Sequence, residues 1–160
     1  MFMLYYSLVY PYLTYCNIVW GTANNSLLNK LFMLQKRAIR LCAGVSYRTS
    51  TAPLFVHYQK LKLVDINKLQ IILFMYKRKY NLLPWCCMNY ATICDSVRNH
   101  ETRSVQYFKQ PRYKTCIRKK SVVISGPILW NSLPVNIQRC SSFSSLKKNV
   151  IQFFTNSYLI

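Results

Sequence analysis

Residues 26–44, SLLNKLFMLQKRAIRLCAG, contain the clearest helical pattern in the chain and set the expected fold class. Ser26 can cap the start of a helix, and Gly44 can close its end. At 100° per residue, most apolar side chains fall on one face and the basic ones on the opposite face. The apolar face holds Leu27, Leu28, Leu31, Leu34, Ala38, Leu41 and Cys42, and the basic face holds Lys30, Lys36, Arg37 and Arg40. We therefore expect an amphipathic helix that buries its leucines and exposes its cations.

Three further segments, all after this one in the sequence, also favour helices. Residues 65–84 have helical spacing, with Asp65 as a natural N-cap and Pro84 as the stop. Residues 51–61 predict a short helix capped by Thr51, and residues 141–154 a terminal helix. The sequence thus predicts a mainly α protein.

The sequence pattern changes after Pro84. Residues 98–120 hold eight basic residues and one acid, and residues 121–125, SVVIS, are prone to form a β-strand. A glycine and two prolines interrupt residues 125–138, SGPILWNSLPVNIQ, so we expect a rigid turn there instead of a helix. The predicted turn residues are Gly126, Pro127, Trp130, Asn131 and Pro134. We expect a helical lobe, 1–84, followed by a smaller, irregular, basic lobe, 85–160, with little β structure.

Two roles are open for Trp130 in this turn. The favoured role is structural: the ring anchors the C-terminal lobe, while Asn131 caps the backbone that follows. The alternative role is a platform on which a nucleic-acid base stacks.

Charge is the strongest compositional feature. The chain has 22 Lys and Arg against three Asp and Glu, a formal net charge of +19 over 160 residues. Such a chain attracts polyanions, so nucleic acid is the leading expected partner and an anionic membrane surface the second. A solvated basic surface that lacks an acidic neighbour remains the plainer explanation. The candidate nucleic-acid-binding residues are Lys30, Lys36, Arg37, Arg40, Arg103, Arg112, Lys114, Arg118 and Lys119, with Tyr107 and Tyr113 for base stacking.

The N-terminal 29 residues carry no charge and keep a membrane alternative open. Pro11 interrupts the apolar run, and no Lys or Arg precedes it as a signal peptide requires. We therefore favour a buried helix pair around Pro11. The competing hypothesis is a small basic membrane-associated protein with an N-terminal hydrophobic segment.

Residues for catalysis or metal binding are sparse. Asp65, Asp95 and Glu101 have no acidic neighbours in sequence, so no catalytic or metal site is predicted. The seven cysteines form no Cys-x-x-Cys pair. Scattered free thiols are typical of a reducing compartment, so we expect an intracellular protein, cytoplasmic or nuclear.

Six segments, in this order, carry a resemblance to a known family. They are SLVYPYLTYCNIVWG (7–21), LFMLQKRAIRLCAG (31–44), RTSTAPLF (48–55), LQIILFMYKRKYNLLP (69–84), NHETRS (99–104) and GPILWNSLP (126–134). Over about residues 5–155 the chain resembles the C-terminal part of the reverse transcriptase of LINE-type non-LTR retrotransposons, in the Jockey/CR1-like group. The resemblance implies that 1–84 is a thumb-like lobe that grips template RNA and nascent DNA beside a palm domain.

The departures from that family are equally informative. The Tyr-x-Asp-Asp loop of the polymerase and the upstream endonuclease are absent from this sequence. The resemblance therefore implies a truncated fragment of an RNA-directed DNA polymerase that is inactive alone. In the intact enzyme Mg²⁺ is the cofactor, and no cofactor is expected in this chain.

Overall fold

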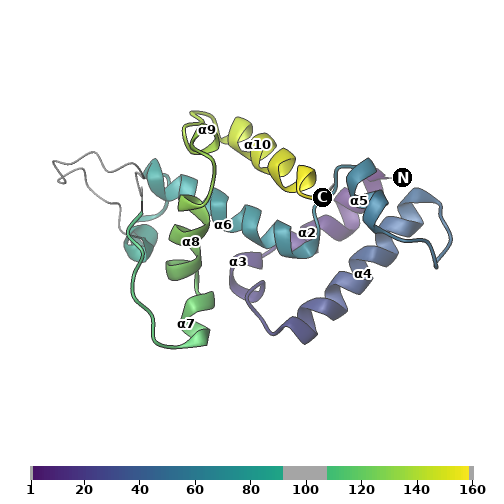
Figure 1. Ribbon diagram of the computed structural model, residues 1–160, viewed down its shortest axis with the longest axis horizontal. Helices are drawn as coiled ribbons and strands as arrows, with labels where there is room; N and C mark the ends of the chain where they lie inside the picture. The colour runs from purple at the N-terminus through teal and green to yellow at the C-terminus, as the bar shows by residue number, and fades with distance from the viewer. Residues whose placement is uncertain (1, 92–107, 159–160) are drawn as a thin grey trace. The chain divides into compact units, whose positions relative to one another are not determined.

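The computed structural model describes residues 2–91 and 108–158, and every regular element in these two ranges is a helix (Figure 1). The N-terminal elements are α1 (Phe2–Leu4), the π-helix η1 (Tyr5–Val9), α2 (Tyr10–Thr14), α3 (Asn17–Trp20), α4 (Asn25–Ala43), α5 (Ala52–His57) and α6 (Leu63–Lys79). After these come the 3-10 helix η2 (Trp85–Tyr90), α7 (Cys116–Lys120), α8 (Val122–Asn131), α9 (Val135–Gln138) and α10 (Phe143–Asn156). The expected mainly α fold is confirmed.

The chain divides into two compact units. Unit 1 comprises Met1–Gln70 and Lys147–Ile160, and unit 2 comprises Ile71–Leu146. Helices α6 and α10 each contribute to both units. This division differs from the predicted lobes 1–84 and 85–160 at both the central boundary and the C-terminus.

The core of unit 1 is a cluster of Tyr5, Ile39 and Phe55, each at most 1% exposed. These residues come from η1, α4 and α5, so the cluster joins three segments that are distant in sequence. Pro11 lies in the first turn of α2, where the amide hydrogen that proline lacks is not needed. The break in this region falls at Cys16, which adopts a left-handed conformation between α2 and α3.

Helix α4 matches its predicted length, but its buried face does not match. Gly44 is left-handed, at φ +66°, and closes the helix as predicted, whereas Asn24 and not Ser26 occupies the N-cap. Leu27, Leu34 and Leu41 are exposed, and the fully buried residues are Gln35 and Ile39. The prediction that the leucine face is buried is therefore wrong.

The physical reason is that the buried arc of α4 is rotated from the predicted face. Ala38 and Cys42 of that face are partly buried against the core cluster, but Phe32 and Ile39 join them there in place of the exposed leucines. Gln35 interrupts this arc in the sequence, which made it look polar. Its amide donates hydrogen bonds to the Tyr5 hydroxyl, at 3.0 Å, and to the Leu61 carbonyl, at 2.9 Å. These partners allow a polar side chain to be buried at the centre of the contact.

Unit 2 corrects two predictions at once, because residues 122–131 form α8. The β-prone run and the first part of the predicted rigid turn are both helical. Ile124, Gly126, Pro127 and Trp130 are buried in this helix, so tertiary packing overrides both the β propensity and the proline inside it. The turn is confined to the residues between α8 and α9, and Pro134 precedes the first residue of α9.

The remaining helix boundaries differ modestly from those expected. Thr51 occupies the N-cap position of α5, as predicted, but its side chain makes no capping hydrogen bond, and the helix already ends at His57. Asp65 lies inside the first turn of α6 and not at its cap, and this helix ends at Lys79, before Pro84. Helix α10 runs from Phe143 to Asn156, two residues later at each end than the predicted terminal helix 141–154. Among the described residues, no helix combines the length and apolar character needed to cross a bilayer.

Candidate nucleic-acid interface

The basic segment 109–120 runs along the surface of unit 2. Residues 109–114 have no regular structure, and residues 116–120 form α7. Every residue from 112 to 120 is exposed. These exposed residues include Arg112, Lys114, Arg118 and Lys119, as expected, together with Lys120. The Thr115 hydroxyl accepts a hydrogen bond from the Arg118 amide at 3.3 Å and so caps α7.

The start of this segment is held by the last turn of α8. The Asn131 amide donates to the Phe108 carbonyl at 2.8 Å, and the Asn131 side-chain oxygen accepts from the Phe108 amide at 3.3 Å. Trp130 packs edge-to-face on the Phe108 ring, with the centroids 5.9 Å apart. The segment therefore begins directly after a residue, Phe108, that hydrogen bonds and ring packing hold in place.

This arrangement decides between the two roles of Trp130. Its side chain is 0% exposed, so no base can stack on it in this structure, and its structural role is the observed one. Asn131 does bond to backbone, as expected, but to Phe108 upstream and not to the residues that follow.

Tyr113 lies among the cations of the segment. Its ring is 41% exposed, and the Lys119 ammonium lies 5.9 Å from the ring centroid. An exposed ring beside a cation suits contact with a base and its phosphate. Arg103 and Tyr107 lie outside the described residues.

The four predicted cations of α4 belong to unit 1 and do not form one exposed face. Lys30 and Arg37 are exposed. Lys36 is half-buried with its ammonium 4.4 Å from the Phe32 ring, and Arg40 donates to the Thr49 carbonyl at 2.8 Å. Arg37 also donates to the Tyr47 hydroxyl at 3.3 Å, so three of the four predicted contacts are engaged in local packing, although their positive charge remains.

One residue that the sequence analysis missed lies beside these cations. Tyr47, in the loop between α4 and α5, is 64% exposed and lies against Arg37 and Arg40. The available signal was a tyrosine next to Arg48 in GVSYRTS, at the basic end of the predicted helix.

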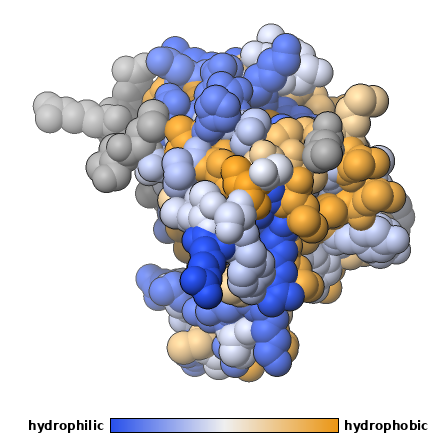
Figure 2. Space-filling view, turned by 90° about the vertical axis from the view of Figure 1, so that its right-hand side faces the viewer, coloured by the Kyte–Doolittle hydropathy of each residue, from blue (hydrophilic) through white to orange (hydrophobic). Residues whose placement is uncertain are grey.

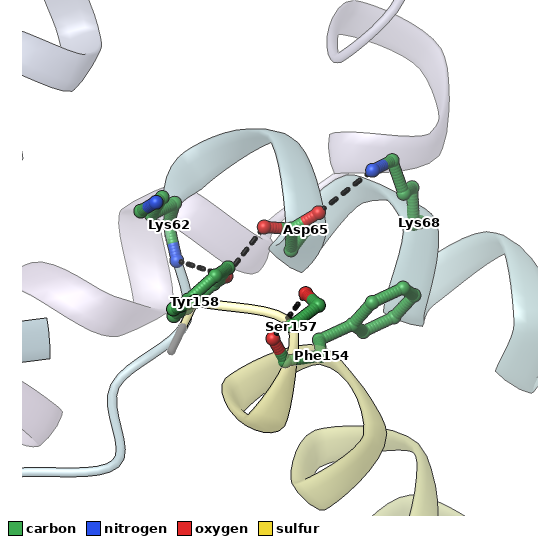
Figure 3. Close-up of polar contacts among 6 residues, drawn as sticks. All are labelled: Lys62, Asp65, Lys68, Phe154, Ser157 and Tyr158. Atoms are coloured by element: carbon green, nitrogen blue, oxygen red, sulfur yellow. Dashed lines mark hydrogen bonds and ion pairs between the residues drawn. The ribbon is translucent and has the colours of Figure 1, made fainter. Parts of the chain in front are cut away.

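Negative charge is scarce around both regions. Asp65 is the only carboxylate side chain in residues 2–91 and 108–158. It is 7% exposed and is already engaged by Lys68, at 2.8 Å, and by the Tyr158 hydroxyl (Figure 3). The described residues contain no group of three or more His, Cys, Asp or Glu that could hold a metal ion. The cations of 109–120 thus have no described carboxylate left to neutralise them.

Comparisons of this chain with protein-family models, with curated proteins and with solved structures found no match.

Proposed function

We propose that this chain binds nucleic acid through the backbone phosphates, with segment 109–120 as the main contact. The observation that carries the proposal is the exposure of residues 112–120, which contain five cations and no acid. Cations placed along an open surface neutralise phosphates and release condensed counterions. No helix of eight or more residues aims these side chains into a groove, so little sequence preference is expected.

The anchoring of the segment favours productive binding. Asn131 fixes Phe108, the residue directly before the segment, and helices α7 and α8 fix its other end, so less chain entropy is lost when a ligand binds. The aromatic ring of Tyr113 adds a stacking contact for unpaired bases.

The resemblance to LINE-type reverse transcriptases supports a more specific role. In that role the chain is a C-terminal fragment of an RNA-directed DNA polymerase. Its ligands are template RNA and nascent DNA, and its missing partner is the palm domain. Mg²⁺ chemistry would belong to that palm, and we derive no catalytic step for this chain.

One observation favours the membrane alternative as a second candidate. Met3, Leu4, Leu8 and Val19 of the charge-free N-terminal segment are all more than half exposed. Figure 2 shows hydrophobic residues gathered beside hydrophilic ones on the face that it draws. Apolar side chains together with a high positive charge suit an anionic bilayer surface. Fractionation with nuclease and with detergent separates the candidates, since nuclease releases a nucleic-acid binder, whereas detergent releases a protein whose apolar side chains are inserted into a bilayer.

The test of the main proposal is a salt titration of binding to labelled single-stranded RNA and to an RNA–DNA hybrid. Replacement of Arg112, Lys114, Arg118 and Lys119 by Ala should weaken binding to all sequences alike. It should flatten the log–log salt slope by roughly 0.7 per lost contact on single strands.

A charge-matched control removes four exposed cations elsewhere. Lys77, Arg139, Lys147 and Lys148 serve this purpose, because they are exposed and lie outside the segment. The control should keep most of the wild-type slope. If both variants lose the same slope, binding follows net charge alone, and segment 109–120 is not a site.

A further inference from the structure

We infer that Tyr47, Arg37 and Arg40 form a stacking site for an unpaired base and its phosphate on unit 1. The inference rests on the proposed nucleic-acid binding and adds a second contact, remote in sequence from segment 109–120. Its ligand is single-stranded nucleic acid, because duplex bases are already stacked and leave no face for a protein ring.

The site is built where the chain turns back after α4. Gly44 adopts the left-handed conformation that ends the helix, and the loop then returns beside the last turns of α4. The Arg40 side chain donates from Nε to the Thr49 carbonyl at 2.8 Å, which ties the loop to the helix. Tyr47 is therefore held by a fixed loop.

Two guanidinium groups lie against the Tyr47 ring. Their central carbons are 5.7 Å (Arg37) and 5.6 Å (Arg40) from the ring centroid, within the range of cation–π attraction. Arg37 also donates from Nη2 to the Tyr47 hydroxyl at 3.3 Å. These contacts restrict the ring before any ligand arrives, which lowers the entropy that binding must overcome.

The exposure of the ring points to an external ligand. Both arginines come from α4, three residues apart. Tyr47 is nevertheless 64% exposed, so much of the residue is open to solvent. A base stacked on the exposed part of the ring would extend the contact of Tyr47 with the guanidinium groups, and the exposed cations Arg37 and Arg48 would be available for its phosphates.

Tyr12 provides the comparison within the same unit. Its ring is even more exposed, at 79%, but it lies in the segment of residues 1–29, which contains no charge. An exposed tyrosine alone is therefore not the signal. The signal is an exposed tyrosine that two cations have already fixed in place.

The test uses the full chain and two labelled probes, oligo-uridine and a blunt RNA–DNA hybrid. Tyr47→Ala should weaken oligo-uridine binding by about 5- to 100-fold, with little change for the hybrid. Tyr47→Phe keeps the ring and should bind like wild type, and Tyr12→Ala should bind like wild type as well. Ultraviolet crosslinking of wild type to oligo-5-iodouridine, mapped by mass spectrometry, should give an adduct on Tyr47.

The outcomes separate this inference from the proposed function. Unchanged binding by Tyr47→Ala, with no Tyr47 adduct, overturns the stacking site. The segment proposal stands in that case if the quadruple alanine variant still loses affinity. If Tyr47→Ala loses affinity and the quadruple variant does not, the stacking site is supported and the segment proposal fails. Wild-type protein that binds neither probe overturns both.

Discussion

Tyr158 donates a hydrogen bond from its hydroxyl to the carboxylate of Asp65, 93 residues earlier in the chain (Figure 3). The same hydroxyl oxygen accepts from the Lys62 amide at 3.2 Å, and the second Asp65 oxygen pairs with Lys68 at 2.8 Å. The turn after α10 is thus tied to the start of α6 within unit 1. The one carboxylate side chain among the described residues stabilises the fold, and both of its oxygens are engaged in hydrogen bonds.

Removal of the Tyr158 hydroxyl tests this tie. Tyr158→Phe should lower the free energy of unfolding by about 1–3 kcal/mol, because it leaves a mostly buried carboxylate oxygen and the Lys62 amide without that partner. The measurement is urea denaturation followed by circular dichroism. Phe153→Tyr adds a hydroxyl at a 41% exposed ring and should change stability by less than about 0.5 kcal/mol. Equal stability of Tyr158→Phe and wild type would contradict the structural role.

Alkaline pH should destabilise unit 1 through its buried phenols. Burial, opposed in part by the Gln35 hydrogen bond, raises the pKa of Tyr5 to about 12, and burial followed by the Asp65 hydrogen bond raises the pKa of Tyr158. The ordinary pKa of an unfolded tyrosine is about 10. A raised folded pKa gives a contribution that is complete below about pH 10 and is lost as pH rises toward the folded value.

The corresponding experiment compares unfolding free energies of wild type and Tyr5→Phe from about pH 8 to pH 12. Wild-type stability should be level at the lower end and fall above about pH 10. Tyr5→Phe should fall less steeply there, because it lacks one of the raised groups. Parallel pH curves would show that Tyr5 ionises equally easily in the folded and unfolded states.

The observed orientation of α4 predicts opposite outcomes for two acidic substitutions in one helix. Ile39→Asp should cost several kcal/mol, because it places an unpaired charge at a 0% exposed position. Leu34→Asp should cost less than about 1 kcal/mol, because that side chain is 57% exposed. Thermal unfolding of the two variants checks this. A severe loss with Leu34→Asp and a mild one with Ile39→Asp would restore the face expected from the sequence.

Helix α4 shows which features of the fold can be predicted from the sequence and which cannot. Local signals placed α4 and its Gly44 terminus, because spacing and capping depend on neighbouring residues. They could not choose the buried face. Gln35 is buried only because Tyr5 and Leu61, 30 and 26 residues away, accept its two hydrogen bonds. Hydrogen bonds to residues so far away in the sequence cannot be read from the periodic pattern of the helix itself.

Helix α8 and the candidate interface give a parallel lesson. Propensity and two prolines favoured a strand and a turn, but residues 122–131 form a helix in which Ile124, Trp130 and two further residues are buried by tertiary packing. The exposure of 112–120 followed from charge and was predictable. The Asn131 bonds to Phe108 and the pairing of Tyr47 with two arginines were not, because each joins separate segments.

Gly126 is needed for the close approach of α8 to Met75 of α6. A Cβ atom at this glycine would lie 2.7 Å from the Met75 sulfur, and Met75 is 0% exposed, so the side chain has little room to move. Gly126→Ala should therefore cost about 1–3 kcal/mol, despite the higher helix propensity of alanine. Differential scanning calorimetry measures the loss.

A double mutant isolates the cause of that loss. In a Met75→Ala background, Gly126→Ala should cost much less or become stabilising, because the clashing sulfur is gone. Additive effects of the two substitutions would mean that the glycine matters for a reason other than this contact.

The Asn131 bonds to Phe108 connect the fold to the proposed binding surface. Asn131→Ala should cost about 1–3 kcal/mol of stability, because two hydrogen bonds to a buried residue are lost.

Asn131→Ala should also weaken single-stranded RNA binding severalfold, since segment 109–120 would lose its fixed start and more chain entropy would oppose binding. All cations remain, so the salt slope should stay close to that of wild type. Asn131→Asp is a harsher change, because its carboxylate can accept from the Phe108 amide but repels the Phe108 carbonyl, so its loss of stability should be at least that of Asn131→Ala. Its added negative charge keeps it out of the binding comparison. A salt titration at a temperature where all variants are folded measures both quantities. Weaker binding with an unchanged slope supports a positioning role for Asn131, whereas a flatter slope would mean that phosphate contacts themselves had been lost.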